Sequence, residues 1–357
     1  MRSWWSLLLL IGASFAASAQ IDPRTAFLEK AGWDAIAAGQ PHVAADVFGQ
    51  AIRADPKNAK LHFGAGTAAF LERRDADAKD ALERALVLDP KLTRARALLG
   101  RVLHQMGDVP AAVRTYEALL VEVPDDKDAA TTLDRWRREL ELHGRMQQAV
   151  GAHFTVAFEG PEEAGLAADA LASLDRAYWR IGDLLGVYPA TAPVVLYTRE
   201  QFRDITRSPQ WAAGAFDGTI RVPTRGALEN QTELDRVLAH EFTHALVRSL
   251  AQRGVPTWLN EGLATALETD DLGWAERRVQ QSGRAPLGQL QNGFGRFTGD
   301  QAQLAYATSA LAVQRLIREA GGFAIANLLR DVGDGADFDT AFLHRIQRSF
   351  SEFQTGF

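Results

Sequence analysis

The chain of 357 residues contains no cysteine. That absence excludes disulfides, a lipid attached through cysteine, and the cysteine-rich sites that usually hold a structural zinc ion. An excess of basic charge is also missing, since 39 Lys and Arg stand against 45 Asp and Glu, a net charge of −6. We therefore expect no nucleic acid and no anionic membrane surface as a partner.

Long apolar runs are absent after the N-terminus, so we expect no membrane span. The N-terminus itself has the three parts of a secretory signal. Arg2 supplies the basic start, residues 4–15 the apolar stretch, and Ala17-Ser18-Ala19 the small-residue pattern before Gln20. We predict a signal peptide over residues 1–19 and a periplasmic or secreted mature protein. An amphipathic helix of a cytosolic protein is the alternative, but the segment has no polar face.

Residues 20–148 carry a repeat with a period of 34. Glycine recurs at 32, 66 and 100, alanine at 44, 78 and 112, and proline at 56, 90 and 124. A large residue follows each alanine by four positions, namely Phe48, Leu82 and Tyr116. This pattern resembles the tetratricopeptide repeat, in which each unit is a helix hairpin packed on its neighbours. We predict three repeats and a capping helix from Lys127 to about Gln148, forming an all-α solenoid.

A solenoid of this kind has a concave groove lined by the first helix of each repeat. Such grooves usually bind extended or helical peptides, so we expect a protein or peptide partner there. A dimerisation surface and a rigid spacer remain the alternatives. No basic cluster for a peptide carboxylate is evident in the sequence, so the class of ligand stays open.

The strongest chemical signal is His240-Glu241-Phe242-Thr243-His244, with Glu261 further along the chain. Helical residues four apart share a face, so His240 and His244 can direct both imidazoles at one ion. Glu241 lies on a neighbouring face, where its carboxylate can reach a water beside the metal. Glu261 can supply a third ligand from a second helix. We predict one Zn²⁺ per chain held by His240, His244 and Glu261, with Glu241 as the general base.

Local signals place both parts of this motif on helices. Thr232, with Asp235 three residues on, suggests an N-cap for the first helix, which we expect to end near Gly254. Thr257 is expected to cap the next helix, so that Glu261 lies just past its first turn. Two ordinary histidines can show this spacing by chance, but the downstream glutamate on a capped helix argues against that interpretation.

These residues carry a family resemblance. His240–His244 together with Trp258-Leu259-Asn260-Glu261-Gly262-Leu263-Ala264 resemble the gluzincin clan of zinc metallopeptidases, which includes thermolysin and the aminopeptidase N family. The resemblance covers about residues 232–270 and implies the same zinc ligands and base. The gap between His244 and Glu261 is slightly shorter than in the aminopeptidases. Their exopeptidase motif, Gly-Ala-Met-Glu-Asn, is matched only loosely by Gly214-Ala215-Phe216-Asp217. The whole chain looks like small bacterial proteins that join tetratricopeptide repeats to a compact gluzincin-like domain.

Water attack on a carbonyl also needs a donor for the developing oxyanion. We select Tyr306, the one tyrosine that follows the motif, on a helix expected to run to about Ile317. A tyrosine at the edge of the core is the alternative role, and His344 is a weaker candidate donor. A zinc-bound histidine usually donates its second N–H to a carboxylate. Three acids past the motif are candidates for that position, and the sequence does not choose among them: Glu268, Asp270 and Asp271.

Residues 149–357 are predicted to form an α+β domain. Residues 153–158 and 193–197 alternate as strands, and residues 164–185 are expected to be helical. Residues 218–223 are predicted to be an edge strand, because Pro223 cannot donate to a central ladder. That edge could pair with an extended substrate, or Pro223 could simply blunt it.

The predicted fold class is therefore multidomain, an all-α tetratricopeptide solenoid followed by an α+β gluzincin-like metallopeptidase domain. The predicted function is that of a zinc-dependent peptidase of the bacterial envelope; an endopeptidase is favoured over an exopeptidase, although the sequence does not decide between the two. Glu241 would take a proton from zinc-activated water and return it to the leaving amine, while Tyr306 holds the oxyanion. The alternative is a repeat-based scaffold of an envelope complex with a weakly active or inactive metal domain. The intact Glu241 favours the enzyme.

Overall fold

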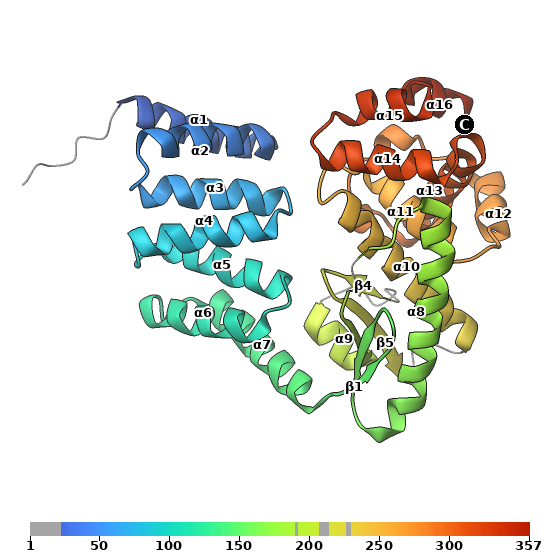
Figure 1. Cartoon of the computed structure of the whole chain (residues 1–357), viewed down its shortest axis with the longest axis horizontal. Coiled ribbons are helices and arrows are strands. Elements are labelled where there is room, and N and C mark those ends of the chain that lie inside the picture. Colours follow the sequence, from blue (N-terminus) through green and yellow to red (C-terminus); the bar gives the residue numbers. More distant parts are fainter. Residues whose placement is uncertain (1–22, 190–191, 207–213, 226–229) are drawn as a thin grey trace, which may run out of the picture.

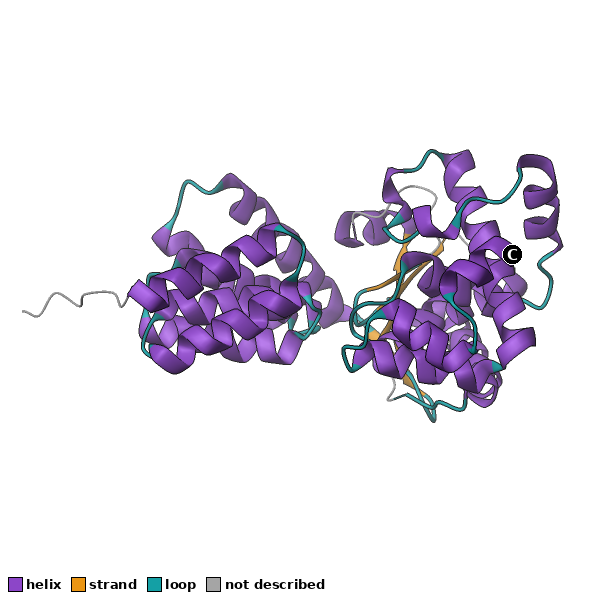
Figure 2. Ribbon diagram, turned by 90° about the horizontal axis from the view of Figure 1, so that it is seen from above, coloured by secondary structure: helices purple, strands orange, loops and turns teal. Residues whose placement is uncertain are grey.

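The computed structural model describes residues 23–189, 192–206, 214–225 and 230–357, which form two lobes (Figure 1). The predicted signal peptide lies outside the described residues. The N-terminal lobe is helical throughout, and all the strands lie in the C-terminal lobe (Figure 2). Among the described helices, none is long and apolar enough to cross a membrane.

The N-terminal lobe is a stack of three helix pairs. The pairs are α1 (Pro23–Ala37) with α2 (Pro41–Ala54), α3 (Ala59–Leu71) with α4 (Asp75–Leu88), and α5 (Thr93–Gln105) with α6 (Val109–Glu122). The recurring glycines face the recurring large residues. A Cβ added at Gly32 would lie 2.7 Å from the Phe48 ring, and one added at Gly100 would lie 2.4 Å from the Tyr116 ring. The period of 34 therefore reflects a packing requirement, because only glycine leaves room for the ring.

The stack is capped by α7 (Lys127–Arg145), whose Trp136 packs edge to face on Tyr116 at 4.4 Å between ring centroids. This helix ends three residues before the predicted end. The chain then enters β1 (Gln147–Val150), which pairs antiparallel with β2 (Thr155–Phe158). The sequence did not reveal β1 because its burial does not alternate and most of its residues are exposed.

The sheet has five strands in the order β1-β2-β3-β5-β4, with β3 at Val194–Thr198, β4 at Ala215–Phe216 and β5 at Ile220–Arg225. The three inner strands run parallel, and β1 and β4 are antiparallel to their neighbours. The prediction of an edge strand over residues 218–223 was wrong, because β4 pairs with the outer side of β5. That pairing covers only Ile220 and Arg221. Pro223 lies beyond it, so its missing N–H group costs no hydrogen bond to β4.

Alternate strand residues face two different layers of helices. The helices of these layers are α8 (Ala164–Leu185), α9 (Arg199–Thr206) and α10 (Gln231–Leu250). Leu196 and Val222 pack with α8 and α10, whereas Val195 and Tyr197 pack with α9 and with Leu142 of α7. The last helix of the repeat lobe therefore covers one face of the sheet, and the two lobes share a hydrophobic cluster.

The rest of the C-terminal lobe is helical. Its elements are η1 (Pro161–Glu163), α11 (Thr257–Leu267), α12 (Gly273–Ser282), η2 (Leu287–Gln289), η3 (Phe294–Arg296), α13 (Gly299–Ala320), α14 (Gly322–Gly333), α15 (Phe338–Ile346) and α16 (Phe350–Gly356). Helices α11 and α13 approach closely at Gly262, where an added Cβ would lie 2.6 Å from the carbonyl oxygen of Ser309. This approach brings Glu261 of α11 and Tyr306 of α13 to the same cavity.

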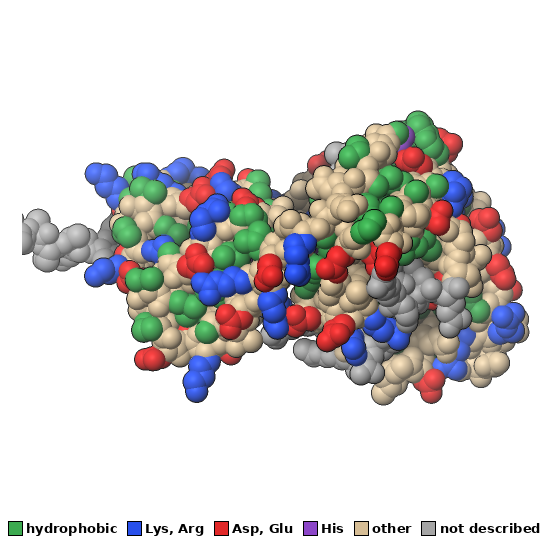
Figure 3. Space-filling model, turned by 90° about the horizontal axis from the view of Figure 1, so that it is seen from below, with side chains coloured by type: hydrophobic (Ala, Val, Ile, Leu, Met, Phe, Trp, Pro, Cys, Tyr) green, Lys and Arg blue, Asp and Glu red, His purple; other side chains and the backbone are tan. Residues whose placement is uncertain are grey.

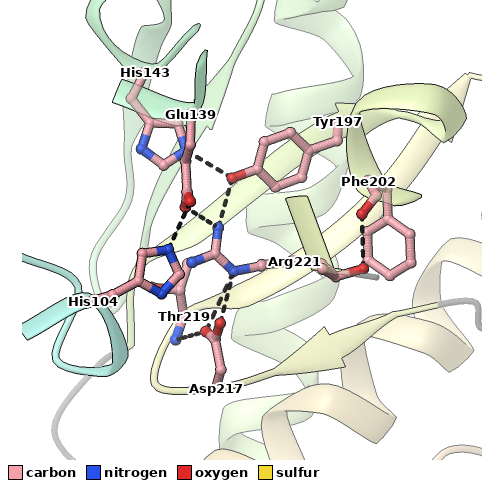
Figure 4. Close-up of polar contacts among 9 residues, drawn as sticks. His104, Glu139, His143, Tyr197, Phe202, Asp217, Thr219 and Arg221 are labelled. Carbon is pink, nitrogen blue, oxygen red and sulfur yellow. Dashed lines mark hydrogen bonds and ion pairs between the residues drawn. The ribbon is translucent and has the colours of Figure 1, made fainter. Parts of the chain in front are cut away.

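A buried polar cluster joins the two lobes (Figure 4). Arg221 Nη1 on β5 donates to Glu139 Oε1 on α7 at 2.9 Å and to the Tyr197 hydroxyl at 2.7 Å. His104 on α5 donates from Nε2 to Glu139 Oε2 at 2.7 Å. Burial alone would raise the pKa of Glu139, but the His104 hydrogen bond and the Arg221 charge outweigh it and hold this pKa at about 2. Glu139 is therefore ionised at neutral pH although it is buried.

Charged side chains also meet on the surface between the lobes. Seen from below, basic and acidic side chains stand beside one another where the lobes join (Figure 3). Arg138 of α7 lies 3.4 Å from Asp204 of α9, and both side chains are exposed. The junction thus combines a buried ion cluster with an exposed pair, which contributes little to stability.

Candidate metal centre

The helix that carries the two histidines begins at Gln231. Its N-cap is Asn230, whose side-chain oxygen accepts from the backbone N–H of Glu233 at 3.0 Å. The prediction of Thr232 as the cap was wrong, because Asn230 offers the same type of acceptor two residues earlier and the helix extends back to it. The motif lies in the middle of α10, as expected.

The helix that carries Glu261 has no side-chain cap, so the prediction that Thr257 caps it was also wrong. Thr257 is the first residue of α11 and follows Pro256. The backbone N–H groups of Thr257 and Trp258 donate to the carbonyls of Gln291 and Leu290. A distant loop therefore satisfies the free donors at this helix end, which local sequence cannot indicate.

The three predicted metal ligands come together. The Nε2 atoms of His240 and His244 are 3.2 Å apart, and Glu261 Oε2 lies 3.8 Å from the first and 3.6 Å from the second. A tetrahedral zinc ion with bonds of about 2.0–2.2 Å holds its ligand atoms about 3.3–3.6 Å apart. The observed triangle fits such an ion within a few tenths of an ångström.

Each histidine is oriented through its other nitrogen. His240 Nδ1 lies 2.7 Å from Glu268 Oε2, and His244 Nδ1 lies 3.2 Å from Asn260 Oδ1. These oxygens accept, so each Nδ1 carries the proton and each Nε2 keeps its lone pair for a metal. Of the three acids that the sequence left open, the structure places Glu268 at His240.

Glu268 is itself held in place. Arg236 of α10 donates to its Oε1 at 2.8 Å, and the Glu268 side chain is buried. Asp270, by contrast, is exposed. Sequence reasoning missed Asn260, for which the available signal was its position immediately before Glu261.

The Glu241 carboxyl is buried beside the ligands. Burial raises its pKa to about 7, His244 opposes that rise, and the carboxylates of Glu261 and Glu268 add to it. Gly214, immediately before β4, packs directly on this carboxyl. A Cβ at Gly214 would lie 2.5 Å from Glu241 Oε1. The segment that loosely resembles the exopeptidase motif therefore borders the predicted base.

These groups line a cavity of about 760 Å³. Its lining also includes Tyr306, whose ring packs edge-on against Phe294 at 5.2 Å between centroids. Burial raises the pKa of the Tyr306 hydroxyl, and the nearby Glu261 and Glu241 raise it further, so the hydroxyl stays protonated and can donate. His344 does not line this cavity; it is exposed and lies 3.9 Å from Asp331.

Family models match both lobes of the chain. A model of the Peptidase MA superfamily matches residues 175–347, and two tetratricopeptide repeat models match residues 29–93 and 69–135. The chain therefore carries a Peptidase MA superfamily domain preceded by tetratricopeptide repeats. The predicted combination of repeats with a gluzincin-type domain is confirmed. No match was found among curated proteins.

Solved tetratricopeptide structures also match the chain. The first tetratricopeptide domain of human RPAP3 is 23% identical over 33% of this chain and 93% of that one, with a TM-score of 0.32. The Sgt2 tetratricopeptide domain of Aspergillus fumigatus is 24% identical over 37% and 93%, with a TM-score of 0.33. MamA is 26% identical over 34% and 71%, with a TM-score of 0.33.

Proposed function

We propose that this protein is a zinc-dependent endopeptidase of the bacterial envelope whose repeats bind a protein substrate or partner. One observation carries the proposal. The ligand atoms of His240, His244 and Glu261 lie within 4.8 Å of one another, beside the buried carboxyl of Glu241. Structural zinc sites usually have four protein ligands and are rich in cysteine, whereas a catalytic site has three and a fourth position for water.

The roles of the side chains follow from their positions. A zinc ion held by the triad would supply Lewis acidity and make a water molecule easier to deprotonate. Glu241 accepts the proton of that water as it attacks the scissile carbonyl, then transfers it to the leaving amine. Tyr306 donates a hydrogen bond to the oxygen on which negative charge develops. Glu268 and Asn260 hold the two imidazoles in the orientation that metal binding requires.

An extended substrate fits beside β4. Among the described strands this one lies at the edge of the sheet, and Ala215 and Phe216 line the cavity. The free side of an edge strand can pair with a substrate backbone, which provides affinity with little sequence preference. Gly214 lets that edge approach Glu241 closely. This arrangement favours an endopeptidase acting on extended polypeptide.

The envelope location is proposed from the N-terminal residues alone. The pattern from Arg2 to Ala19 is that of a secretory signal. Substrates would then be exported or envelope polypeptides, presented to the cavity while the repeats bind them or a partner.

Metal analysis of the purified mature protein tests the ligand set. We expect one zinc ion per chain in the wild type and in Glu241→Gln, because Glu241 is not a ligand. His244→Ala and Glu261→Ala should lose the ion while keeping the wild-type circular dichroism spectrum. Stoichiometric zinc in either alanine variant would contradict the assignment.

Peptide hydrolysis tests the role of Glu241. Glu241→Gln should lower kcat/KM by about 100-fold or more, because general acid-base catalysis contributes about 10²–10⁴. The competing function is a scaffold with an inactive metal domain. Full complementation of a deletion strain by Glu241→Gln, with loss of complementation when residues 20–148 are removed, would favour the scaffold instead.

A further inference from the structure

The turn between the helices of the second repeat differs from the same turn in its neighbours. Each turn contains a residue in the left-handed backbone region, and these three positions are 34 residues apart. They are Gly39 with φ of 72°, Arg73 with φ of 59° and Gly107 with φ of 83°. Glycine adopts this conformation without steric cost, whereas arginine does not. The second repeat therefore keeps an arginine where its own fold favours glycine.

This turn is also the one that docks on the catalytic lobe by ion pairs. Glu72 pairs with Arg253, and Asp75 pairs with Arg248 at 2.5 Å. The positions that correspond to Glu72 hold Ala38 and Met106, and those that correspond to Asp75 hold Pro41 and Val109. None of those four residues can form an ion pair. The charged turn of the second repeat is thus specific to the contact with the C-terminal end of α10.

The docking brings Arg73 to the lining of the cavity that contains Glu241 and Tyr306. Its Nη1 donates to Gln105 Oε1 at 2.7 Å, and the amide nitrogen of Gln105 donates in turn to Asp75. Arg73 is exposed, but this chain of hydrogen bonds holds its guanidinium to the same turn that contacts α10.

The other cavity arginines in the described part of the chain are neutralised. Arg236 pairs with Glu268 at 2.8 Å, and Arg248 and Arg253 pair with the two acids of the second-repeat turn. The one side-chain hydrogen bond that Arg73 makes among the described residues is to the neutral amide of Gln105. Within the described residues, the cavity wall therefore presents one arginine without a carboxylate partner, and the repeats contribute it.

We infer that Arg73 is a specificity-determining residue that binds the carboxylate of an acidic side chain in the polypeptide substrate. The inference rests on the proposed function, since it names the substrate preference of that site. A guanidinium matches a carboxylate in shape and charge and can form two parallel hydrogen bonds to it. The repeats thus supply part of the substrate cleft as well as a surface for partners.

The experiment compares hydrolysis of blocked, unstructured peptides that differ only in one Asp or Asn, with the acidic position moved along the series. We expect the best Asp peptide to exceed its Asn partner in kcat/KM by about tenfold or more, as for a charge-assisted hydrogen bond. In Arg73→Gly this ratio should fall toward one. Glycine occupies the same left-handed conformation in the first and third repeats, so the variant should fold. Arg73→Lys should restore part of the preference.

Arg84→Gln is the matched control, because it removes an exposed charge from α4 of the same repeat and Arg84 does not line the cavity. It should keep the full ratio. A free C-terminal carboxylate has the same chemistry as an acidic side chain, so an Asn peptide with a free C-terminus is compared with its amide. If the free C-terminus raises kcat/KM and an Asp side chain does not, the assignment of an acidic side chain as the ligand of Arg73 is overturned.

Binding separates failure of this inference from failure of the proposed function. The same labelled peptides are titrated by fluorescence anisotropy into zinc-loaded Glu241→Gln protein, with and without Arg73→Gly. If Asp peptides bind more tightly than Asn peptides and Arg73→Gly removes the difference, the inference is supported. If in addition the wild-type protein hydrolyses no peptide, the proposed function fails and the inference stands. Hydrolysis or binding that ignores the acidic residue, or a preference that persists in Arg73→Gly, overturns the inference.

Discussion

Arg221 of β5 and Glu139 of α7 form an ion pair of 2.9 Å in which each side chain is at most 2% exposed. The pair lies between the sheet of the C-terminal lobe and α7, the helix that caps the repeats. Asp217, which lines the cavity, accepts from Nε of the same arginine at 3.1 Å. The guanidinium of Arg221 therefore contacts both Glu139 of the repeat lobe and Asp217 of the cavity lining.

Removing one member of this pair should destabilise the whole chain. Arg221→Met leaves Glu139 buried with His104 but without its ionic partner, and removing one partner of a buried ion pair typically costs about 3–5 kcal/mol. Chemical denaturation would measure the change in the free energy of unfolding. Arg138→Met is the control, since it breaks the exposed pair with Asp204 between the same lobes and should cost at most about 1 kcal/mol. Equal effects of the two substitutions would show that the buried pair has no special role.

The same pair predicts loss of stability in acid. The pKa of Glu139 is about 2 in the folded chain, whereas the ordinary value for a glutamate side chain is 4.5. Folding therefore favours the ionised form. Its contribution is complete above about pH 4.5 and disappears as the pH falls toward 2. The stability difference between wild type and Glu139→Gln, measured by denaturation from pH 7 to pH 3, should stay constant to about pH 5 and then shrink. A difference that grows in acid would refute this account.

Zinc affinity should depend strongly on Glu268 and little on the nearby Asp270. Glu268→Gln removes the charge that orients His240, and the loss of such a partner typically weakens metal binding by about 10–100-fold. Asp270→Asn makes the same chemical change at an exposed position two residues away and should leave affinity unchanged. Competition with a chromophoric chelator measures both. Similar affinities for the two variants would argue against the observed hydrogen bond as the orienting contact.

The role assigned to Tyr306 has a kinetic signature. If its hydroxyl stabilises only the developing oxyanion, Tyr306→Phe should lower kcat by about 10²–10³ and change KM little. The variant should still bind zinc, because Tyr306 is not among the ligands. A rise in KM with unchanged kcat would instead indicate a role in substrate binding.

Processing of the N-terminus can be measured directly. Protein recovered from the periplasm of a Gram-negative host should begin at Gln20, because Ala17-Ser18-Ala19 has the small-residue pattern that signal peptidases cleave. N-terminal sequencing and intact mass give the answer. Recovery of the chain with Met1 in the cytosolic fraction would contradict the proposed location.

Two errors in the sequence predictions occurred where distant segments meet. Thr257 was expected to cap α11, but carbonyls of the loop at Leu290 and Gln291 satisfy that helix end. Residues 218–223 were expected at a sheet edge, yet the two residues of β4 pair with Ile220 and Arg221 of that segment. A two-residue strand has too few positions to show alternation, so no pattern in the sequence could reveal it.

The sequence by itself determined the features that local geometry decides. A period of 34 predicts stacked helix hairpins because each hairpin packs mainly on its neighbours, and Gly32 and Phe48 show that packing in detail. The spacing of His240 and His244 predicts convergence because four residues make about one helical turn. The tertiary structure alone decided which acid holds His240, which strand borders Glu241, and that Arg73 of a repeat reaches the cavity. Those relations depend on how elements far apart in the sequence pack against one another. Such packing depends on the combined surfaces of several elements, which a pattern within one segment cannot predict.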